Sequence, residues 1–254
     1  PIHAGVAQGS VLGPLLFSVF INDIPTSLLH SRFHLYADDF QFYHQCDPDK
    51  LIDGIDLVNG ELDRVSHWAT VNNIKINPLK SQAMVVWKRP LTTTHLPFIS
   101  LNDCSIPFSS HVKNLGIYIS NDLSWSKHVD VVCRRVLGML HGLRKLSYCS
   151  TQSLRMNLVK SLLVPHFAFG DIIFSTSIDA ESTRRMQVTF NSCTRYVFKL
   201  KPYSHISSHI NNILGSNLET FYRINLIKYI FKLLNPSKFK IPNYLVIFSP
   251  LDSL

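Results

Sequence analysis

The chain has 254 residues, of which 46% are hydrophobic, and a formal net charge of +8. This length can bury a sizeable core and form more than one subdomain. The longest apolar runs, residues 11–21 and 158–169, contain Pro, Gly or Lys and are too short to span a membrane. Five widely spaced cysteines without a Cys-x-x-Cys pair argue against a disulfide framework or a zinc knuckle. They indicate reduced thiols in the nucleus or the cytoplasm.

The charge is unevenly distributed along the chain. Residues 1–127 carry 9 Lys and Arg against 11 Asp and Glu, whereas residues 128–254 carry 16 against 6. A near-neutral half followed by a basic half is typical of a catalyst that binds a polyanion. Solvated surface lysines are the alternative, but an imbalance of this size favours nucleic acid as the partner.

The first expected elements are a loop, a helix and a hairpin. Residues 5–13 are punctuated by glycine, and Pro14 fits the first position of a helix that ends before Pro25. Residues 33–37 and 40–43 are apolar and aromatic, as strands are. The two acids between them, at positions 38 and 39, are therefore expected at the tip of a strand–turn–strand unit.

Helices dominate the remaining pattern. Residues 55–73 predict an amphipathic helix, residues 83–87 and 117–119 predict short strands, and residues 221–234 predict a last helix. Apolar residues recur at helical spacing in three stripes: Val58, Leu62, Val65 and Ala69; Val132, Val136, Met139, Leu143 and Leu146; and Met186, Phe190, Cys193 and Val197. The second half of the chain is therefore expected to be mostly helical.

Asp38 and Asp39 are the strongest candidates for chemistry. Adjacent residues on a straight strand point to opposite faces, but in a tight turn the two carboxylates can converge. Bringing two like charges together is unfavourable unless a cation neutralises them. Hard oxygen ligands with no nearby cysteine favour Mg²⁺ or Mn²⁺. A solvated Asp-Asp turn, which is common in hairpins, is the alternative.

Four segments carry a family resemblance when they are taken together. They are residues 5–17 with Gln8-Gly9, Tyr36-Ala37-Asp38-Asp39, residues 77–81 with Lys80, and residues 115–119 with Leu115-Gly116. In this order and spacing they resemble the successive palm motifs of a reverse transcriptase, most of all that of non-LTR (LINE-type) retrotransposons. The resemblance covers most of the chain and is strongest up to about Leu146.

This resemblance implies an α+β fold. A partial polymerase palm, an antiparallel sheet with helices, is expected over residues 1–127. A helical thumb is expected over residues 128–200, and a helical C-terminal extension over residues 201–254. The implied activity is that of an RNA-directed DNA polymerase, which joins nucleotides by two-metal catalysis with Mg²⁺ or Mn²⁺. The implied partners are an RNA template, a DNA primer and deoxynucleoside triphosphates, with no membrane; no oligomeric state is indicated.

The resemblance also assigns roles in the catalytic centre. Asp38 and Asp39 would hold the metal ions, and Lys80 would face the triphosphate. Tyr36 would lie under the primer end, where the small Ala37 leaves room for the backbone. A half-buried hairpin aromatic and a solvated turn lysine are the alternatives for Tyr36 and Lys80.

Further residues are expected to contact the nucleic acid. Gln8 and Gly9 match the motif that approaches the template, although Ala7 precedes them where the family usually has Pro and so removes a fixed φ angle. Leu115-Gly116 resembles the primer-grip turn. Arg134 with Lys145, and Arg184 with Arg195, lie eleven residues apart and share helix faces opposite the apolar stripes, where they would contact a duplex. Solvated basic faces are the alternative.

One expected element of the family is not found in this sequence. The first palm motif, typically ending in Ala-Phe-Asp with a third metal-binding carboxylate, does not occur. We therefore expect no measurable polymerase activity from the isolated chain. A non-catalytic remnant that binds nucleic acid is the alternative to an active polymerase domain.

Overall fold

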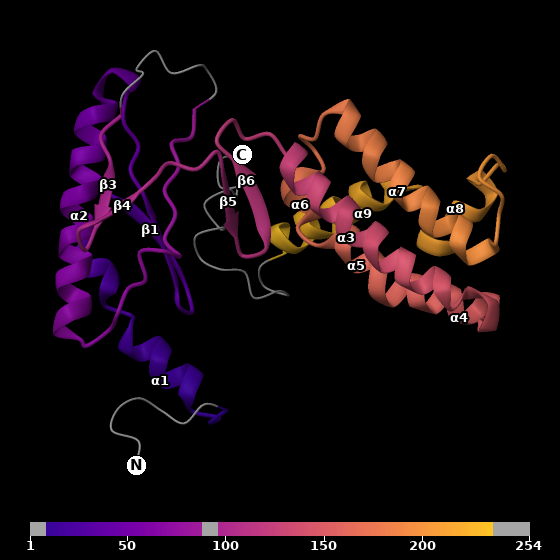
Figure 1. Ribbon diagram of the computed structural model, residues 1–254, viewed down its shortest axis with the longest axis horizontal. Helices are drawn as coiled ribbons and strands as arrows, with labels where there is room; N and C mark the ends of the chain where they lie inside the picture. The colour runs from indigo at the N-terminus through magenta and orange to yellow at the C-terminus, as the bar shows by residue number, and fades with distance from the viewer. Residues whose placement is uncertain (1–8, 88–95, 236–254) are drawn as a thin grey trace. The chain divides into compact units, whose positions relative to one another are not determined.

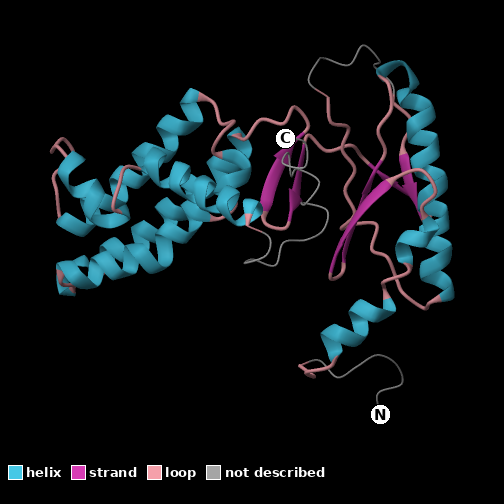
Figure 2. Cartoon of the chain, turned by 180° about the vertical axis from the view of Figure 1, so that it is seen from behind, coloured by secondary structure: helices cyan, strands magenta, loops and turns pink. Residues whose placement is uncertain are grey.

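The computed structural model describes residues 9–87 and 96–235. The chain divides into two compact units, Pro1–Val112 and Lys113–Leu254. The first combines strands with one long helix, and the second is mostly helical (Figures 1 and 2). This confirms the expected α+β class. The expected limits of palm, thumb and extension stay a prediction.

The first unit is built around one long helix and short hairpins. Its elements are α1 (Gly13–Phe20), η1 (Ile24–Ser27), β1 (Arg32–Tyr36), β2 (Asp39–Tyr43), η2 (Pro48–Lys50), α2 (Leu51–Val71), β3 (Ile99–Leu101) and β4 (Cys104–Ile106). Strand β5 (His111–Asn114) crosses the boundary between the units and pairs with β6 (Ile117–Ser120). The described strands form three separate two-stranded sheets, β1–β2, β3–β4 and β5–β6.

Helix α2 supplies the core of the first unit. Leu62, Val65 and Ala69 are buried on one face, and Val58 is half-buried against the same apolar cluster, which confirms the predicted stripe. The helix packs against β3, and Phe42 of β2 contacts the same apolar cluster. The helix begins four residues before the expected start, because the preceding 3₁₀ turn η2 leads directly into it.

The expected strand at residues 83–87 is wrong. In the part of the chain that the structure describes, this segment makes only an isolated bridge between Ala83 and Phe108, with the Ser109 N–H donating to the Ala83 carbonyl over 2.8 Å. A strand needs a partner over several residues to satisfy its backbone groups. Residues 83–87 have the composition of a strand, but none of the described strands pairs with them.

The second unit is a helical assembly entered through β6. Its helices are α3 (Ser126–Lys145), η3 (Ser147–Cys149), α4 (Gln152–Leu158), the π-helical turn η4 (Val159–Leu163), α5 (Val164–Ala168), α6 (Asp171–Phe174), α7 (Ala180–Phe198), α8 (Ser207–Leu214) and α9 (Leu218–Leu234). This confirms the strand expected at residues 117–119, the helical second half and the last helix.

Helices α3 and α7 pack together and form the centre of the second core. All four residues of the predicted α7 stripe are buried, and Phe190 meets Phe167 edge-on at 5.5 Å between ring centroids. On α3, Val132 and Val136 are buried, but Leu146 is 62% exposed. The helix ends at Lys145, so the stripe no longer faces the core at Leu146.

Candidate active site

The paired acids lie at a hairpin tip, as predicted. Tyr36 pairs with Asp39 across β1 and β2, which leaves Ala37 and Asp38 as a two-residue turn. All four residues are exposed, and Tyr36 retains 65% of its surface. Ala37 has a φ of +50°, a conformation that tight hairpin turns require but that is costly for a residue with a Cβ. The backbone thus brings both carboxylates to one exposed end.

A buried carboxylate holds the segment that leads into this hairpin. Glu61 of α2 has no exposed surface, and its Oε1 accepts the backbone N–H groups of Leu29, His30 and Ser31 over 2.9, 2.7 and 3.2 Å. Burial opposes ionisation of this carboxyl, but the Ser31 hydroxyl and the three backbone N–H groups favour the charged form and lower its pKa. Glu61 thereby fixes where β1 begins.

The sequence did not single out Glu61, although a signal was present. Its position falls between Val58 and Val65 at i+3 and i+4 spacing, on the apolar face of the helix. A carboxylate on such a face needs buried hydrogen-bond donors, since an isolated buried charge is very unfavourable. The partners themselves could not be read from the sequence, because they are main-chain groups of a loop.

Lys80, predicted to be catalytic, and Gly9, predicted to contact the template, lie on separate turns of the first unit. Lys80 is exposed, and its turn is closed by Asn77, whose Oδ1 accepts the Leu79 N–H over 3.0 Å. Gly9 is exposed in a turn with a φ of +87°. Gln8 lies outside the described residues. Tyr36 and Ala37 therefore lie at the hairpin tip with the two acids, whereas Lys80 and Gly9 are exposed in other turns.

No third ligand joins the acid pair in the part of the chain that the structure describes. Within that part, no group of three or more His, Cys, Asp or Glu side chains could hold a metal ion. A cavity of about 540 Å³ lies between η1 and α2, next to His67 and Trp68, and no predicted site residue lines it. A metal ion bound by the exposed carboxylates of Asp38 and Asp39 would therefore need further ligands.

The turn Leu115-Gly116 joins β5 to β6, as expected for a hairpin. Both residues have positive φ, +45° for Leu115 and +90° for Gly116, which is the conformation of a two-residue hairpin turn of type I′. Glycine adopts this conformation readily, whereas Leu115 adopts it at a cost. Leu115 remains 47% exposed, so an apolar side chain projects from the turn.

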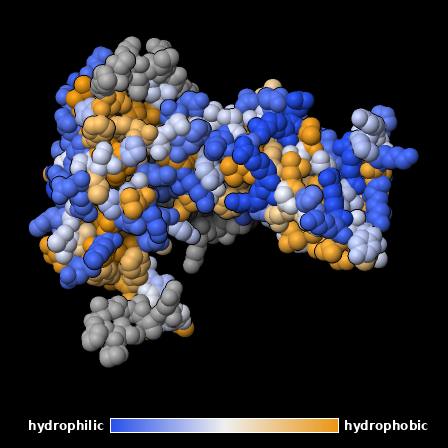
Figure 3. Space-filling view, in the orientation of Figure 1, coloured by the Kyte–Doolittle hydropathy of each residue, from blue (hydrophilic) through white to orange (hydrophobic). Residues whose placement is uncertain are grey.

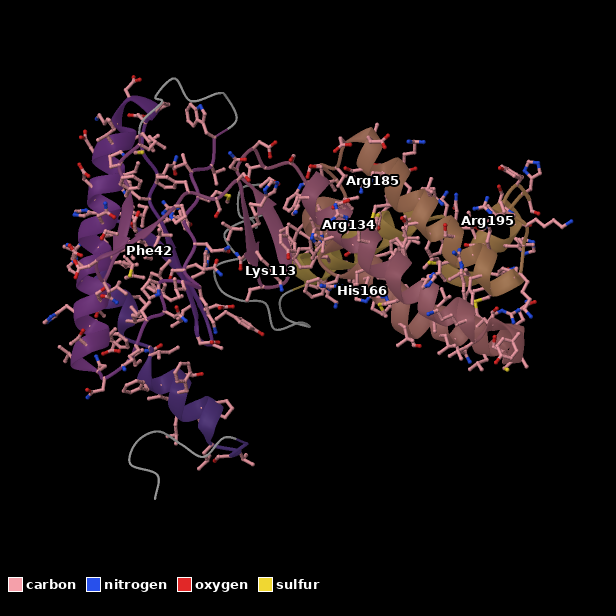
Figure 4. All side chains as sticks on the ribbon, in the orientation of Figure 1. Phe42, Lys113, Arg134, His166, Arg185 and Arg195 are labelled. Atoms are coloured by element: carbon pink, nitrogen blue, oxygen red, sulfur yellow. The ribbon has the colours of Figure 1, made fainter. Side chains whose placement is uncertain are left out.

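The basic face of the second unit is more internally paired than expected. Hydrophilic side chains gather over α3 and α7 (Figure 3). Arg134 of α3 and Arg185 of α7, both labelled in Figure 4, each form an ion pair with Asp130. Partial burial opposes ionisation of Asp130, but the hydrogen bond from Arg185 and the charge of Arg134 prevail and lower its pKa. Arg134 nevertheless keeps 75% of its side chain exposed.

Arg195 differs from its expected position. It is half-buried, and its Nε is buried without a hydrogen-bond partner among the described residues. Helix α8 packs against α7. Arg184, its expected partner on that face, is exposed and pairs with Glu181 at 3.0 Å. Sequence spacing placed both residues on one face of α7, but it could not show that Arg195 would be half-buried and Arg184 exposed.

Comparisons with known proteins identify sequences that are similar to this chain. A family profile for reverse transcriptase (RNA-dependent DNA polymerase) matches residues 1–119. The probable RNA-directed DNA polymerase from transposon X-element of Drosophila melanogaster is 29% identical over 209 residues, 77% of this chain and 22% of that protein. The RNA-directed DNA polymerase from mobile element jockey of the same species is 30% identical over 184 residues, 67% of this chain and 19% of that protein.

A more distant relative is the retrovirus-related Pol polyprotein from type-1 retrotransposable element R1 of Bradysia coprophila, 23% identical over 77% of this chain and 19% of that protein. The chain spans about a fifth of the length of the curated relatives it matches. No solved structure gives a significant match. No helix in the described ranges is long and apolar enough to cross a membrane. The ordered motifs and these relatives show that the chain belongs to the reverse transcriptases of LINE-type retrotransposons.

Proposed function

We propose that this chain is the part of a LINE-type RNA-directed DNA polymerase that carries its paired catalytic carboxylates. The observation that carries the proposal is the exposed turn that presents Asp38 and Asp39 side by side in sequence at the end of β1–β2. In this proposal residues 1–127 form part of the palm, residues 128–200 the thumb, and residues 201–254 a C-terminal extension. The template is RNA, the primer is DNA, and the substrates are deoxynucleoside triphosphates.

The acid pair fits a divalent metal by its donor chemistry. Two exposed carboxylates provide hard oxygen ligands, which suit Mg²⁺ or Mn²⁺ better than softer metals. Bound in pairs, such ions would neutralise the charge that develops on the attacking and leaving oxygens of nucleotidyl transfer. Asp38 and Asp39 would hold them together with ligands that the described residues do not supply.

The neighbouring residues would position the reactants. Tyr36 offers an exposed aromatic surface beside the acids, on which the primer end can rest. The exposed ammonium of Lys80 can balance the charge of the triphosphate or protonate the departing pyrophosphate. Gln8 and Gly9 would approach the template, and the turn Leu115-Gly116 would hold the primer terminus.

The basic helices would bind the duplex. Arg134 and Arg195 are the residues proposed for phosphate contact, and the exposed guanidinium of Arg134 is the better placed of the two. All five cysteines are free thiols, which suits work in the reducing nucleus or cytoplasm. Binding of nucleic acid without catalysis is the second candidate, favoured by the absence of a third ligand near the acids within the described ranges.

Primer extension on an RNA template distinguishes the two functions. The protein to test is the product of the longest reading frame that contains these residues, in Mg²⁺ and in Mn²⁺. Because metal ions contribute several kcal/mol to such reactions, Asp38→Asn or Asp39→Asn should reduce extension by at least about a hundredfold. Binding of the template–primer should change little.

Asp103→Asn is the matched control. Asp103 also lies in an exposed two-residue hairpin turn of the first unit, between β3 and β4, and has a φ of +60°. This variant should extend primers at the normal rate. Extension that survives both acid substitutions would contradict the assignment of the catalytic centre. Duplex binding without extension by the unaltered protein would favour the non-catalytic function.

A further inference from the structure

The β5–β6 hairpin packs against the helices of the second unit through two glycines. A Cβ on Gly116 would lie 3.1 Å from Cε1 of Phe169, and a Cβ on Gly170 would lie 2.6 Å from Cδ1 of Ile117. The adjacent pairs Gly116-Ile117 and Phe169-Gly170 therefore each place a side chain over the glycine of the other. Both glycines also have positive φ, +90° and +71°, so a side chain at either would meet strain as well as contact.

His128 adds a polar contact to this apolar one. The backbone N–H of Tyr118, in β6, donates to Nδ1 of His128 on α3 over 3.4 Å. The imidazole is 3% exposed and packs on Phe174 of α6, with 5.0 Å between ring centroids. An imidazole can accept at Nδ1 only when it is neutral and its proton is on Nε2. The contact therefore depends on the protonation state of the ring.

The surroundings of His128 favour the neutral ring. Burial, and then the charge of Arg135 on the same helix, lower the pKa of His128. The titratable groups on the neighbouring helices include His166 of α5, Asp171 of α6 and Tyr222 of α9. Asp171 is already engaged, since it accepts from the Asn225 side chain over 2.6 Å and from the Ile172 N–H over 2.9 Å. His166 has its own pKa lowered by burial and by Arg135.

We propose that His128 is a positioning residue that docks the β5–β6 hairpin on α3 and so fixes the turn Leu115-Gly116 against the helices of the second unit. The inference rests on the proposed function, in which this turn holds the primer terminus. The glycine contacts are apolar and indifferent to pH, so His128 is the part of the docking surface that responds to protonation. Acid would then release the hairpin while leaving the helical core folded.

Amide hydrogen exchange of the full chain tests the docking without any need for activity. Replacing His128 with Phe keeps a ring against Phe174 but removes the acceptor, and exchange of residues 117–120 should accelerate about fivefold. Replacing it with Asn keeps an acceptor close to the position of Nδ1 and cannot be protonated, so protection should be largely retained. His141→Asn, at an exposed position of the same helix, is the control and should change nothing.

The pH profile separates positioning from packing. After correction for intrinsic exchange, protection of residues 117–120 in the unaltered chain should fall as the pH drops below the ordinary histidine value of 6.5. His128→Asn should remove this dependence. Equal protection in the Phe variant and the unaltered chain, or an unchanged pH profile in the Asn variant, would overturn the proposal. If the Phe variant does not fold, the profiles of the Asn variant and the unaltered chain decide.

Steady-state kinetics of the full-length polymerase test the consequence for the primer. His128→Phe should raise the KM for template–primer severalfold with little change in kcat, and His128→Asn should restore it. An unchanged KM alongside faster exchange would show that the docked turn does not hold the primer, and so would overturn that step. If the polymerase proves inactive altogether, the proposed function fails, and the exchange experiment still decides whether His128 docks the hairpin.

Discussion

Glu61 shows how a single residue far from the chemistry can support the candidate site. It is a charged side chain with no exposed surface, and all three of its backbone donors belong to the loop that enters β1. Arg64 lies 3.6 Å from the same oxygen and donates to the Ser27 carbonyl over 3.0 Å. The loop before the Asp-Asp hairpin is thus attached to α2 by its main chain, which ties its position to the helix.

Removing this carboxylate should destabilise the first unit. Glu61→Ala leaves three partly buried N–H groups without their acceptor, and we expect a loss of about 3 kcal/mol in the free energy of unfolding. Glu61→Gln keeps an oxygen acceptor and should lose about 1 kcal/mol. Urea unfolding followed by tryptophan fluorescence measures both, since Trp68 lies on the same helix. Asp63→Asn, exposed on α2, should be neutral.

The pH dependence of this contribution has a defined sign. The pKa of Glu61 is lower in the folded chain than its ordinary value of 4.5, so folding favours the ionised carboxylate. Its stabilisation is fully present above pH 4.5 and is lost as the pH falls through the folded value. The unaltered chain should therefore lose more stability than Glu61→Gln on acidification below pH 4.5. Equal losses in the two proteins would mean that the charge of Glu61 does not contribute.

At the scale of elements, a side-chain cap marks the start of α7 and of α9. Asp179 caps α7, where its carboxylate accepts the Ser182 N–H over 2.7 Å and the Ser182 hydroxyl over 2.9 Å. Both bonds lower the pKa of Asp179, and the bond from the Ser182 backbone N–H has the larger effect. Asn217 caps α9 in the same way by accepting the Thr220 N–H over 2.7 Å. Both caps precede an apolar pattern, which is why the two helices begin where they do.

Loss of the α7 cap should destabilise the second unit in a pH-dependent way. Asp179→Ala removes the acceptor and should lower the free energy of unfolding by about 1 kcal/mol, whereas Asp179→Asn should retain most of it. The contribution of the ionised cap is present above pH 3.8 and is lost as the pH falls through the lowered folded pKa. Thermal unfolding at pH 7 and pH 3 compares the three proteins. A cap that is equally important at both pH values would contradict this account.

Some of these elements could be predicted from the sequence, and others could not. The Asp-Asp hairpin, the α2 stripe and the α7 stripe were predictable, because local periodicity determines them and the fold buries the same residues. The segment 83–87 was not, since whether a β-prone run becomes a strand depends on a partner distant in sequence. Of the candidate site, the exposed turn was predictable. Its attachment through Glu61 was not, because main-chain donors leave no trace in the sequence.

For the molecule as a whole, the two units have separate cores and opposite charge. The first core gathers around Ile55, Leu62 and Leu101, and the second around residues of α3 and α7. The excess of Lys and Arg lies in residues 128–254. Part of that excess is neutralised locally, since Asp130 binds two arginines, yet one carboxylate cannot cancel both charges. A net positive surface remains available to phosphate on α3.

Binding of an RNA–DNA hybrid by the full chain should therefore depend steeply on salt. Each phosphate contact that is lost should reduce the slope of log affinity against log salt by about one unit. Arg134→Ala should produce this change, because its side chain is 75% exposed and Arg185 remains to pair with Asp130. Arg195→Ala should change the slope less, since Arg195 is half-buried and the substitution acts mainly on the packing of α7.

Arg223→Ala is the matched control for this measurement. Arg223 on α9 is 73% exposed and pairs with Glu219 four residues earlier, as Arg134 pairs with Asp130. The two arginines therefore match in exposure and in having a carboxylate partner four residues earlier, although Asp130 is less exposed than Glu219 and also pairs with Arg185. An unchanged slope for Arg223→Ala and a reduced slope for Arg134→Ala would locate the phosphate contact on α3. Equal changes would show that the binding follows total charge, and that no particular face of the second unit holds the duplex.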